Sequence, residues 1–159
     1  MSAQRVARVV VASTRAANGV YPDRTGPLIS AWLADRGITV DEVDVVVDGP
    51  AVGDAIRAGI YAEVDLVVTT GGTGLSPTDR TPEQTRPLLD IELPGLADAI
   101  RTAGLPEVPT AILSRGIAGV AGRSLVINLP GSTGGVRDGL RVMGTVLDHA
   151  LDQIHGEDH

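Results

Sequence analysis

The chain contains no cysteine and no lysine, so all 13 of its basic residues are arginines. These absences exclude a thiolate metal site, a disulfide, a cysteine nucleophile, a Schiff-base lysine and a P-loop lysine. The three histidines, His149, His155 and His159, all lie within the last eleven residues, which argues against a histidine-centred catalytic triad. The sequence therefore offers few of the side chains that supply a nucleophile or a base near neutral pH.

Acidic residues outnumber basic ones by 20 to 13, which gives a formal charge of −7. A nucleic-acid-binding surface needs clustered cations to displace the counterions of the phosphates, and the chain has no basic run. No apolar stretch reaches the ~18 residues of a transmembrane helix, and the first residues lead straight into a predicted strand rather than a signal peptide. We therefore expect a cytoplasmic protein with no nucleic-acid and no membrane partner.

Aromatic residues are scarce, since the chain has no phenylalanine and only Trp32, Tyr21 and Tyr61. Hydrophobic residues nevertheless make up 43% of the 159 residues, which is enough for a packed core and argues against disorder. A chain of about this length usually forms a single domain. We expect residues 1–159 to form one domain with an aliphatic core.

The first half of the chain alternates between strand and helix patterns. Short runs rich in valine predict strands over 8–13, 40–47 and 64–70, and their continuous apolar character is typical of strands that are covered on both faces. Apolar residues at helical spacing between these runs, around 28–33 and 52–60, predict two helices. The resulting βαβαβ order predicts an α/β domain with right-handed crossovers and a mostly parallel sheet.

The second half of the chain does not continue this regular alternation of strand and helix patterns. Thr81 resembles a helix cap because Pro82 and Gln84 follow it at the first and third helical positions, and residues 96–103 predict another short helix. Two further strands are expected over 110–114 and 124–129, joined through 116–122 in a hairpin-like excursion. A final amphipathic helix is expected to end near residue 154.

Three glycine-containing segments follow predicted strands, at 47–50, 69–79 and 129–135. In open α/β sheets, ligands bind beyond the carboxyl ends of the strands, where glycine lets backbone N–H groups approach an anion. Each segment also has a simpler interpretation, since glycines form turns and Asp48 or Thr81 could cap the helix that follows. From the residues alone, both interpretations remain open.

Asp79 is harder to explain as a turn residue. It follows a glycine loop suited to an anion, and a carboxylate there would repel that anion. A Mg²⁺ ion would resolve the conflict, because Mg²⁺ binds one or two carboxylates together with phosphate oxygens. The sequence therefore predicts a Mg²⁺-dependent phosphate or nucleotide site, in which the substrate itself supplies the attacking group.

Several separated motifs occur together in one order. They are Ala12-Ser13-Thr14-Arg15, Asp23-Arg24-Thr25-Gly26-Pro27, Thr69-Thr70-Gly71-Gly72-Thr73-Gly74, Asp79, Thr81-Pro82-Glu83, Leu113-Ser114-Arg115 and Asn128-Leu129-Pro130-Gly131-Ser132. This series resembles the molybdenum-cofactor biosynthesis family of Mog/MoaB type and is similar to the gephyrin G domain. The resemblance covers nearly the whole chain, from about Arg8 to Ile154.

The resemblance implies a three-layer α/β/α sandwich, usually a homotrimer, that binds molybdopterin. Active members transfer AMP from Mg-ATP to the terminal phosphate of molybdopterin and release pyrophosphate, and a downstream molybdate-insertion protein is a candidate partner. By position, Asp48 and Asp79 match the two functionally important acids, which are expected to act in catalysis and to hold Mg²⁺. The substrate-binding residues implied in the same way are Gly71, Gly72, Thr73, Gly74, Ser114, Pro130, Gly131, Ser132 and Thr133.

Two positions depart from the family pattern. The residue before Asp79 is commonly arginine but is Thr78 here, and an acid often follows the first aspartate where this chain has Gly49. Arg80 is a candidate to replace the missing anion contact. The alternatives to an adenylyltransferase are a non-catalytic MoaB-like protein that binds or carries molybdopterin, and a nucleotide-binding regulatory domain related by fold alone.

Overall fold

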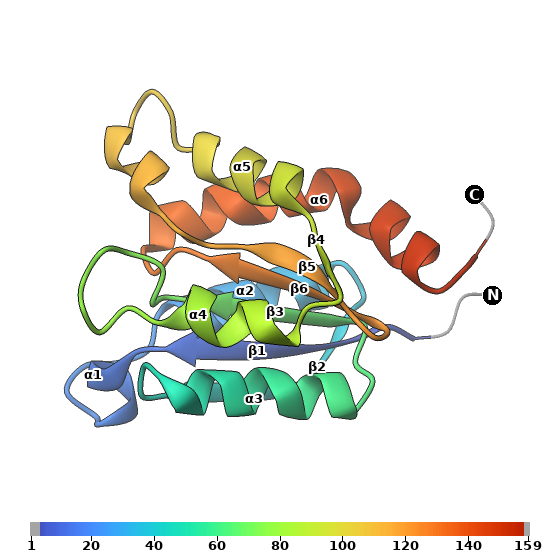
Figure 1. The fold of residues 1–159 in the computed structure, drawn as a ribbon, viewed down its shortest axis with the longest axis horizontal. Coiled ribbons are helices and arrows are strands. Elements are labelled where there is room, and N and C mark those ends of the chain that lie inside the picture. The colour runs from blue at the N-terminus through green and yellow to red at the C-terminus, as the bar shows by residue number, and fades with distance from the viewer. Residues whose placement is uncertain (1–3, 158–159) are drawn as a thin grey trace.

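The computed structural model describes residues 4–157, and within them six strands form one twisted sheet (Figure 1). The strands lie in the order β2-β1-β3-β6-β5-β4. Their bounds are β1 (Val6–Ala12), β2 (Thr39–Val46), β3 (Leu66–Thr70), β4 (Ile91–Glu92), β5 (Ala118–Ala121) and β6 (Ser124–Leu129). The first four strands in this order are parallel, whereas β5 pairs antiparallel with both β6 and β4. The expected mostly parallel sheet is confirmed.

Helices cover both faces of the sheet. The helices are α1 (Thr14–Ala17), α2 (Thr25–Asp35), α3 (Pro50–Tyr61), α4 (Thr81–Thr85), α5 (Pro94–Thr102) and α6 (Thr133–Ile154), and two 3₁₀ segments are η1 (Arg86–Leu88) and η2 (Pro109–Leu113). Buried side chains of α2, α5 and α6 form one aliphatic core with the sheet, and those of α3 form a second core on the opposite face. Figure 1 shows α4 on the same side as α3. The expected α/β/α sandwich is therefore confirmed.

The valine-rich strands lie at the centre because they have apolar side chains on both faces. Val9 and Val11 of β1 belong to one core, while Val10 and Ala12 belong to the other. The five residues of β3 and the six of β6 are all buried. Strands of this kind cannot remain at an exposed edge without losing the hydrophobic free energy of one face.

The prediction of a strand over 110–114 is wrong. This segment forms the 3₁₀ helix η2, which projects beside α5, and Ile112 and Leu113 are about half exposed. The true partner of β6 is β5, which lies inside the segment predicted to connect the strands. The hairpin closes through Gly122 and Arg123, and Gly122 has a φ of +58°, as a two-residue turn with glycine at its first position requires.

The helix expected at Thr81 exists, but the cap does not. Arg80 precedes α4 without a side-chain capping bond, and the Thr81 hydroxyl instead donates to the carbonyl oxygen of Gly71 at 2.9 Å. This contact links two residues that lie ten positions apart, which a local capping pattern does not reveal. Within residues 4–157, no helix has the length and apolarity needed to cross a membrane.

Candidate functional site

Three loops meet where the parallel strands end. Thr70 of β3 is the register partner of Val11 in β1 and of Leu129 in β6, and Ala12 of β1 is the partner of Val46 in β2. The segments that follow β2, β3 and β6 therefore leave the sheet at the same edge. These are the three glycine-containing segments that the sequence identifies as ligand-binding candidates, and the fold brings them together.

The loop after β3 is held by backbone contacts that only glycine permits. Gly71 and Gly72 have φ angles of +89° and +68°, a region that residues with a Cβ rarely adopt. Gly71 N donates to Leu129 O at 3.1 Å, and Thr81 N donates to Gly72 O at 3.0 Å. A Cβ at Gly72 would collide with the hydroxyl of Thr81 and would lie 2.8 Å from Asp48 Oδ2. The loop therefore brings bare backbone against a carboxylate.

Asp48 and Asp79 lie beside this loop, one near Gly72 and the other near Gly74. Burial raises the pKa of the Asp48 carboxyl above its usual range, a hydrogen bond from Arg80 N at 3.2 Å opposes the shift, and the negative charge of Asp79 raises the pKa further. Asp79 Oδ2 accepts a hydrogen bond from Ser76 N at 3.0 Å. The two predicted acids thus lie close enough to repel each other.

The capping role considered for Asp48 is wrong. Gly49 is the residue that precedes α3, and that helix has no side-chain capping bond. The Asp48 carboxylate turns instead toward α4, where it accepts from Arg80 N. Gly49 itself has φ +115° and ψ −144°, a conformation essentially confined to glycine, so the acid common at this position in the Mog/MoaB family would be strained here.

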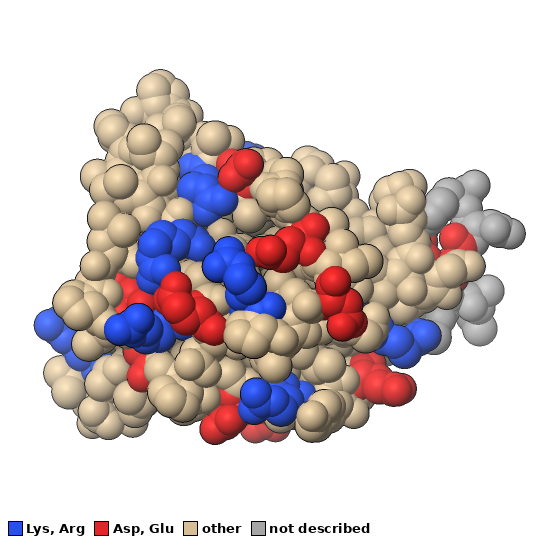
Figure 2. All heavy atoms as spheres, in the orientation of Figure 1, with Lys and Arg blue, Asp and Glu red and all other residues tan. Residues whose placement is uncertain are grey.

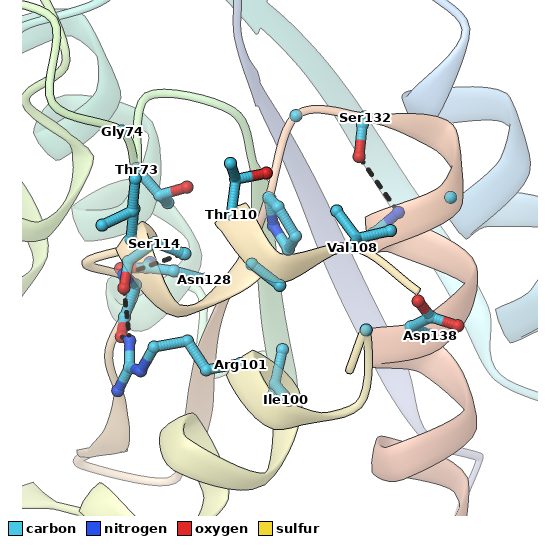
Figure 3. A pocket seen from close by; sticks show the side chains of 18 of the residues that line it. Thr73, Gly74, Ile100, Arg101, Val108, Thr110, Ser114, Asn128, Ser132 and Asp138 are labelled. Carbon is cyan, nitrogen blue, oxygen red and sulfur yellow. Dashed lines mark hydrogen bonds between the residues drawn. The ribbon is translucent and has the colours of Figure 1, made fainter. Parts of the chain in front are cut away.

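A cavity of about 750 Å³ opens between the loop after β3, the start of α6 and the arm formed by α5 and η2. Figure 3 shows Thr73, Gly74 and Ser114 along one side of it, with Ser132 and Asp138 on the opposite side. Eight of the predicted site residues line this cavity: Gly72, Thr73, Gly74, Asp79, Ser114, Pro130, Gly131 and Ser132. The cavity has the size of a small-molecule site.

A second cavity of about 310 Å³ lies against the first. Gly71 and Thr133, the remaining predicted substrate-binding residues, line it together with Ser13, Tyr21 and Asp23. Gly72 and Gly131 line both cavities, and a Cβ at Gly131 would lie 3.3 Å from Gly71 Cα. Asp48 lines neither cavity but approaches Gly72 in the wall that separates them.

The start of α6 adds an anion-binding element. The Ser132 hydroxyl caps this 22-residue helix by accepting from Gly135 N at 3.0 Å (Figure 3). The first-turn N–H groups of a long helix carry a partial positive charge that favours anions. Because a hydroxyl has one donor as well as its acceptor lone pairs, Ser132 retains a proton to donate toward the cavity.

Arg101 and Asn128 line the cavity, although the sequence assigned neither to the site. Arg101 Nη1 donates to Ser114 O and Gly116 O at 2.8 and 2.9 Å, and no local pattern signals this contact. The buried Asn128 side chain accepts from Ile117 N at 3.1 Å and donates to Thr69 Oγ1 at 2.9 Å. The sequence signal that could have identified Asn128 was its place in the motif Asn128-Leu129-Pro130-Gly131-Ser132.

Arg80 does not reach either cavity. It lines a shallow groove on the outer side of the loop, together with Leu75, Glu83 and Arg115. Thr78 is exposed, and its hydroxyl lies 3.3 Å from that of Ser76. The anion contact considered for Arg80 is therefore absent from the described cavities.

Comparison with known proteins gives the family of this chain. The family described as "Probable molybdopterin binding domain" matches residues 8–149. This chain is a member of that family. Molybdopterin adenylyltransferase from Helicobacter pylori strain J99 is 38% identical over 157 residues, which cover 93% of this chain and 86% of that protein.

Other members of the molybdopterin-binding family extend the comparison. A molybdenum cofactor biosynthesis bifunctional protein from Synechococcus elongatus is 42% identical over 96% of this chain, which spans about half (48%) of that protein. The structure of the molybdopterin biosynthesis Mog protein from Mycobacterium ulcerans has a TM-score of 0.94 and 57% identity, covering 98% of this chain and 100% of that one. The chain therefore has the fold of this family, and in this fold Gly72 and Gly131 line both cavities.

Proposed function

We propose that this protein is a molybdopterin adenylyltransferase of molybdenum cofactor biosynthesis. The observation that carries the proposal is the pair of adjoining cavities that share Gly72 and Gly131, with two acids beside the shared wall. A transfer between two substrates needs two sites whose reacting ends meet. Relatives that are named molybdopterin adenylyltransferase and are covered over most of their length support the same activity.

In the proposed arrangement, molybdopterin occupies the larger cavity and ATP the smaller one. Apolar side chains such as Ile100 and Val108 face the organic part of the larger ligand, and Ser132 with the first turn of α6 holds its phosphate. Ser114 and the backbone of 71–74 hold the opposite side. These contacts align the reacting groups, which is a large share of catalysis for phosphoryl and nucleotidyl transfers.

The reaction balances without a protein base. An oxygen of the molybdopterin phosphate forms a bond to the α-phosphorus of ATP, the bond from that phosphorus to the bridging oxygen breaks, and pyrophosphate leaves with its electron pair. The nucleophile is already an anion, so the scarcity of histidine and the absence of lysine and cysteine are compatible with this chemistry. The protein's task is to align the groups and stabilise charge.

Asp48 and Asp79 are the proposed Mg²⁺ ligands. The two carboxylates lie beside the same glycine loop, near Gly72 and Gly74, and residues 4–157 contain no group of three or more acids and histidines that could hold a metal. The donor set therefore fits Mg²⁺ only when phosphate oxygens complete it, as for Mg-ATP. When bound, Mg²⁺ would neutralise charge on the phosphates.

The experiment that tests the function is incubation of the purified protein with molybdopterin and Mg-ATP while pyrophosphate is measured. We expect pyrophosphate release that requires all three components. Molybdopterin binding without pyrophosphate would contradict the enzyme and support the carrier alternative. Binding of ATP without molybdopterin would support the nucleotide-binding regulatory domain.

We also propose that the protein is a homotrimer that acts in the cytoplasm, where ATP is available. The family resemblance supports the trimer, as do the exposed apolar side chains Val43, Val47 and Tyr61. Analytical ultracentrifugation at micromolar concentration should give about three times the 16.4 kDa chain mass. A monomer would contradict the proposal, and a hexamer would favour the MoaB-like carrier.

A further inference from the structure

Arg115 follows the candidate substrate residue Ser114, yet it has no role in the proposed reaction. Its side chain turns away from both cavities and lies in the groove on the outer side of the loop after β3. Figure 2 shows basic and acidic side chains interleaved over the face that carries α4 and this loop. Arg115 contacts three separate points of that region.

Its contacts bracket the segment that ends in Asp79. Arg115 Nε donates to Gly74 O at 2.9 Å and Nη2 donates to Asp79 O at 3.0 Å, so one guanidinium holds both ends of the 74–79 loop. The backbone N of Arg115 adds a bond to Thr73 O at 2.7 Å. The exposed residues 75–78 between these points have no buried side chain to anchor them.

Glu83 fixes the guanidinium from the other side. Arg115 Nη1 donates to Glu83 Oε2 at 2.6 Å and Nη2 donates to Oε1 at 3.3 Å, which is a two-point pair. The hydrogen bond from Arg115 lowers the pKa of the Glu83 carboxyl. Paired carboxylate and guanidinium planes restrict orientation as well as distance, so Glu83 sets the direction in which Arg115 reaches the loop.

The donors of Arg115 are nearly all committed. A guanidinium has five N–H groups, and the contacts to Gly74, Asp79 and Glu83 use four of them. One N–H group remains, so a substrate phosphate could form a two-point contact with Arg115 only by breaking one of these bonds. The side chain is therefore suited to holding protein rather than ligand.

We propose that Arg115, oriented by Glu83, is a positioning residue that fixes the 74–79 loop and thereby the Asp79 carboxylate relative to Ser114. This proposal rests on the proposed function for its catalytic consequence, but the ordering of the loop does not. Ser114 and Asp79 both line the larger cavity, and Arg115 links their segments through its bond to Asp79 O. Small displacements of a catalytic group have large effects on rate.

The test uses Arg115→Lys and Glu83→Gln in the full chain. Lysine keeps the charge but cannot reach Gly74 O, Asp79 O and Glu83 together, because it has a single nitrogen. The matched control is Arg86→Lys, because Arg86 pairs with Glu92 at 3.2 Å in an exposed surface bridge outside the 74–79 loop. Thermal melting first establishes that each variant is folded.

Amide hydrogen exchange measured by NMR reports the loop without any need for activity. Ser76 N donates to the Asp79 carboxylate and Asp79 N donates to Ser76 O at 2.9 Å, so both amides report its closure. We expect at least about fivefold faster exchange at Ser76 and Asp79 in Arg115→Lys, with β6 amides unchanged. Exchange equal to that of Arg86→Lys would overturn the proposal.

Kinetics separate positioning from substrate holding. For Arg115→Lys we expect kcat to fall about 10- to 100-fold with the KM for molybdopterin within about threefold, and for Glu83→Gln a smaller fall. The double variant should be no slower than Arg115→Lys, because the pair acts as a unit. A rise in KM with unchanged kcat would overturn the proposal in favour of substrate binding.

The two readouts distinguish the two possible failures. If the parent releases no pyrophosphate, the proposed function fails, while the exchange rates at Ser76 and Asp79 still decide whether Arg115 orders the loop. If Arg115→Lys does not fold, Glu83→Gln carries the test, since it keeps both the shape of the side chain and an acceptor oxygen. Unchanged exchange in that variant would also contradict the proposal.

Discussion

The two glycine-rich loops of the site are built in opposite ways. The loop after β3 contains two glycines with positive φ, is tied to distant segments by Thr81 and Arg115, and has carboxylates on both sides. The loop after β6 has no acid and no glycine with positive φ, and its hydrogen-bonding groups lead into the first turn of α6. They come within contact distance at Gly71 and Gly131.

This contrast separates two tasks. Carboxylates beside a loop that hydrogen bonds hold in place keep negative charge at a fixed position, which suits a cation. An uncharged loop at a helix start offers N–H groups and a partial positive charge, which suits an anion. Under the proposed function, the loop after β3 serves the chemistry and the loop after β6 holds substrate, and variants that affect one task without the other test the distinction.

The largest effect is expected for the acids. Asp48→Asn and Asp79→Asn keep the shape of the side chain and lose its charge, so adenylyl transfer should fall by about 10²–10³, equivalent to ~3–4 kcal/mol of transition-state stabilisation. The measurement is pyrophosphate release at saturating Mg-ATP. Asp54→Asn on the exposed face of α3 is the matched control. Turnover of both acid variants within a few-fold of the parent would remove the acids from catalysis.

The second-largest effect is a change in stability when a glycine of the loop after β3, or one at the start of α6, is replaced by alanine. Gly72→Ala forces a Cβ into a left-handed conformation against Thr81 and Asp48, which should lower the free energy of unfolding by about 1–3 kcal/mol. Gly134→Ala, in the first turn of α6 just after the other loop, meets no atom within 4 Å outside its own stretch of helix and should raise it by up to about 1 kcal/mol. Urea unfolding measures both values. Equal changes would show that the two backbone positions do not differ in their tolerance of a Cβ.

A smaller effect is expected at Ser132. Loss of the cap in Ser132→Ala should reduce the free energy of unfolding by about 0.5–2 kcal/mol. Loss of one neutral hydrogen bond to substrate should weaken molybdopterin binding by roughly two- to twelve-fold, with ATP binding unchanged. Calorimetric titration of both ligands and a thermal melt separate these effects. A lower melting temperature with unchanged molybdopterin affinity would refute the binding role and leave the cap.

The smallest effect is the pH dependence of the metal-free protein. Burial raises the pKa of Asp48 above the value of 3.8 that applies when the chain is unfolded. Between the two pKa values, the folded state binds more protons than the unfolded state, so the free energy of unfolding should fall as the pH rises through this window. Urea unfolding from pH 4 to 7 should show a weaker fall in Asp48→Asn. A steeper fall in that variant would contradict the assignment.

The sequence predicted the centre of this fold better than its periphery. The runs that form β1, β3 and β6 are apolar on both faces, so burial alone identifies them. The segment 110–114 also has an apolar centre, yet it forms the 3₁₀ helix η2 and is not part of the six-stranded sheet that residues 4–157 contain. Local composition reports a preference for burial, but it does not identify the neighbour.

For the candidate site, the sequence predicted the location but not the long-range contacts. Glycines after strands predicted where the cavities lie, because the edge of a parallel sheet fixes that position. The partners of Asp48 and Thr81 were not predictable, since Asp48 accepts from a residue 32 positions away and Thr81 donates to one ten positions away. Arg101 had no signal at all, because its role depends on carbonyl groups of a segment that the sequence placed in a strand and its connection.

The shared wall at Gly72 and Gly131 also has a consequence for inhibitor design. Because Gly72 and Gly131 line both cavities, we expect that a short linker can join a fragment that fits the larger one to a fragment that fits the smaller one. The second fragment then binds at a high effective concentration, which increases affinity without any new contact. A Cβ at Gly72 would collide with Thr81 and lie 2.8 Å from Asp48 Oδ2, so a substitution there that gave resistance would also disturb the site of the proposed reaction.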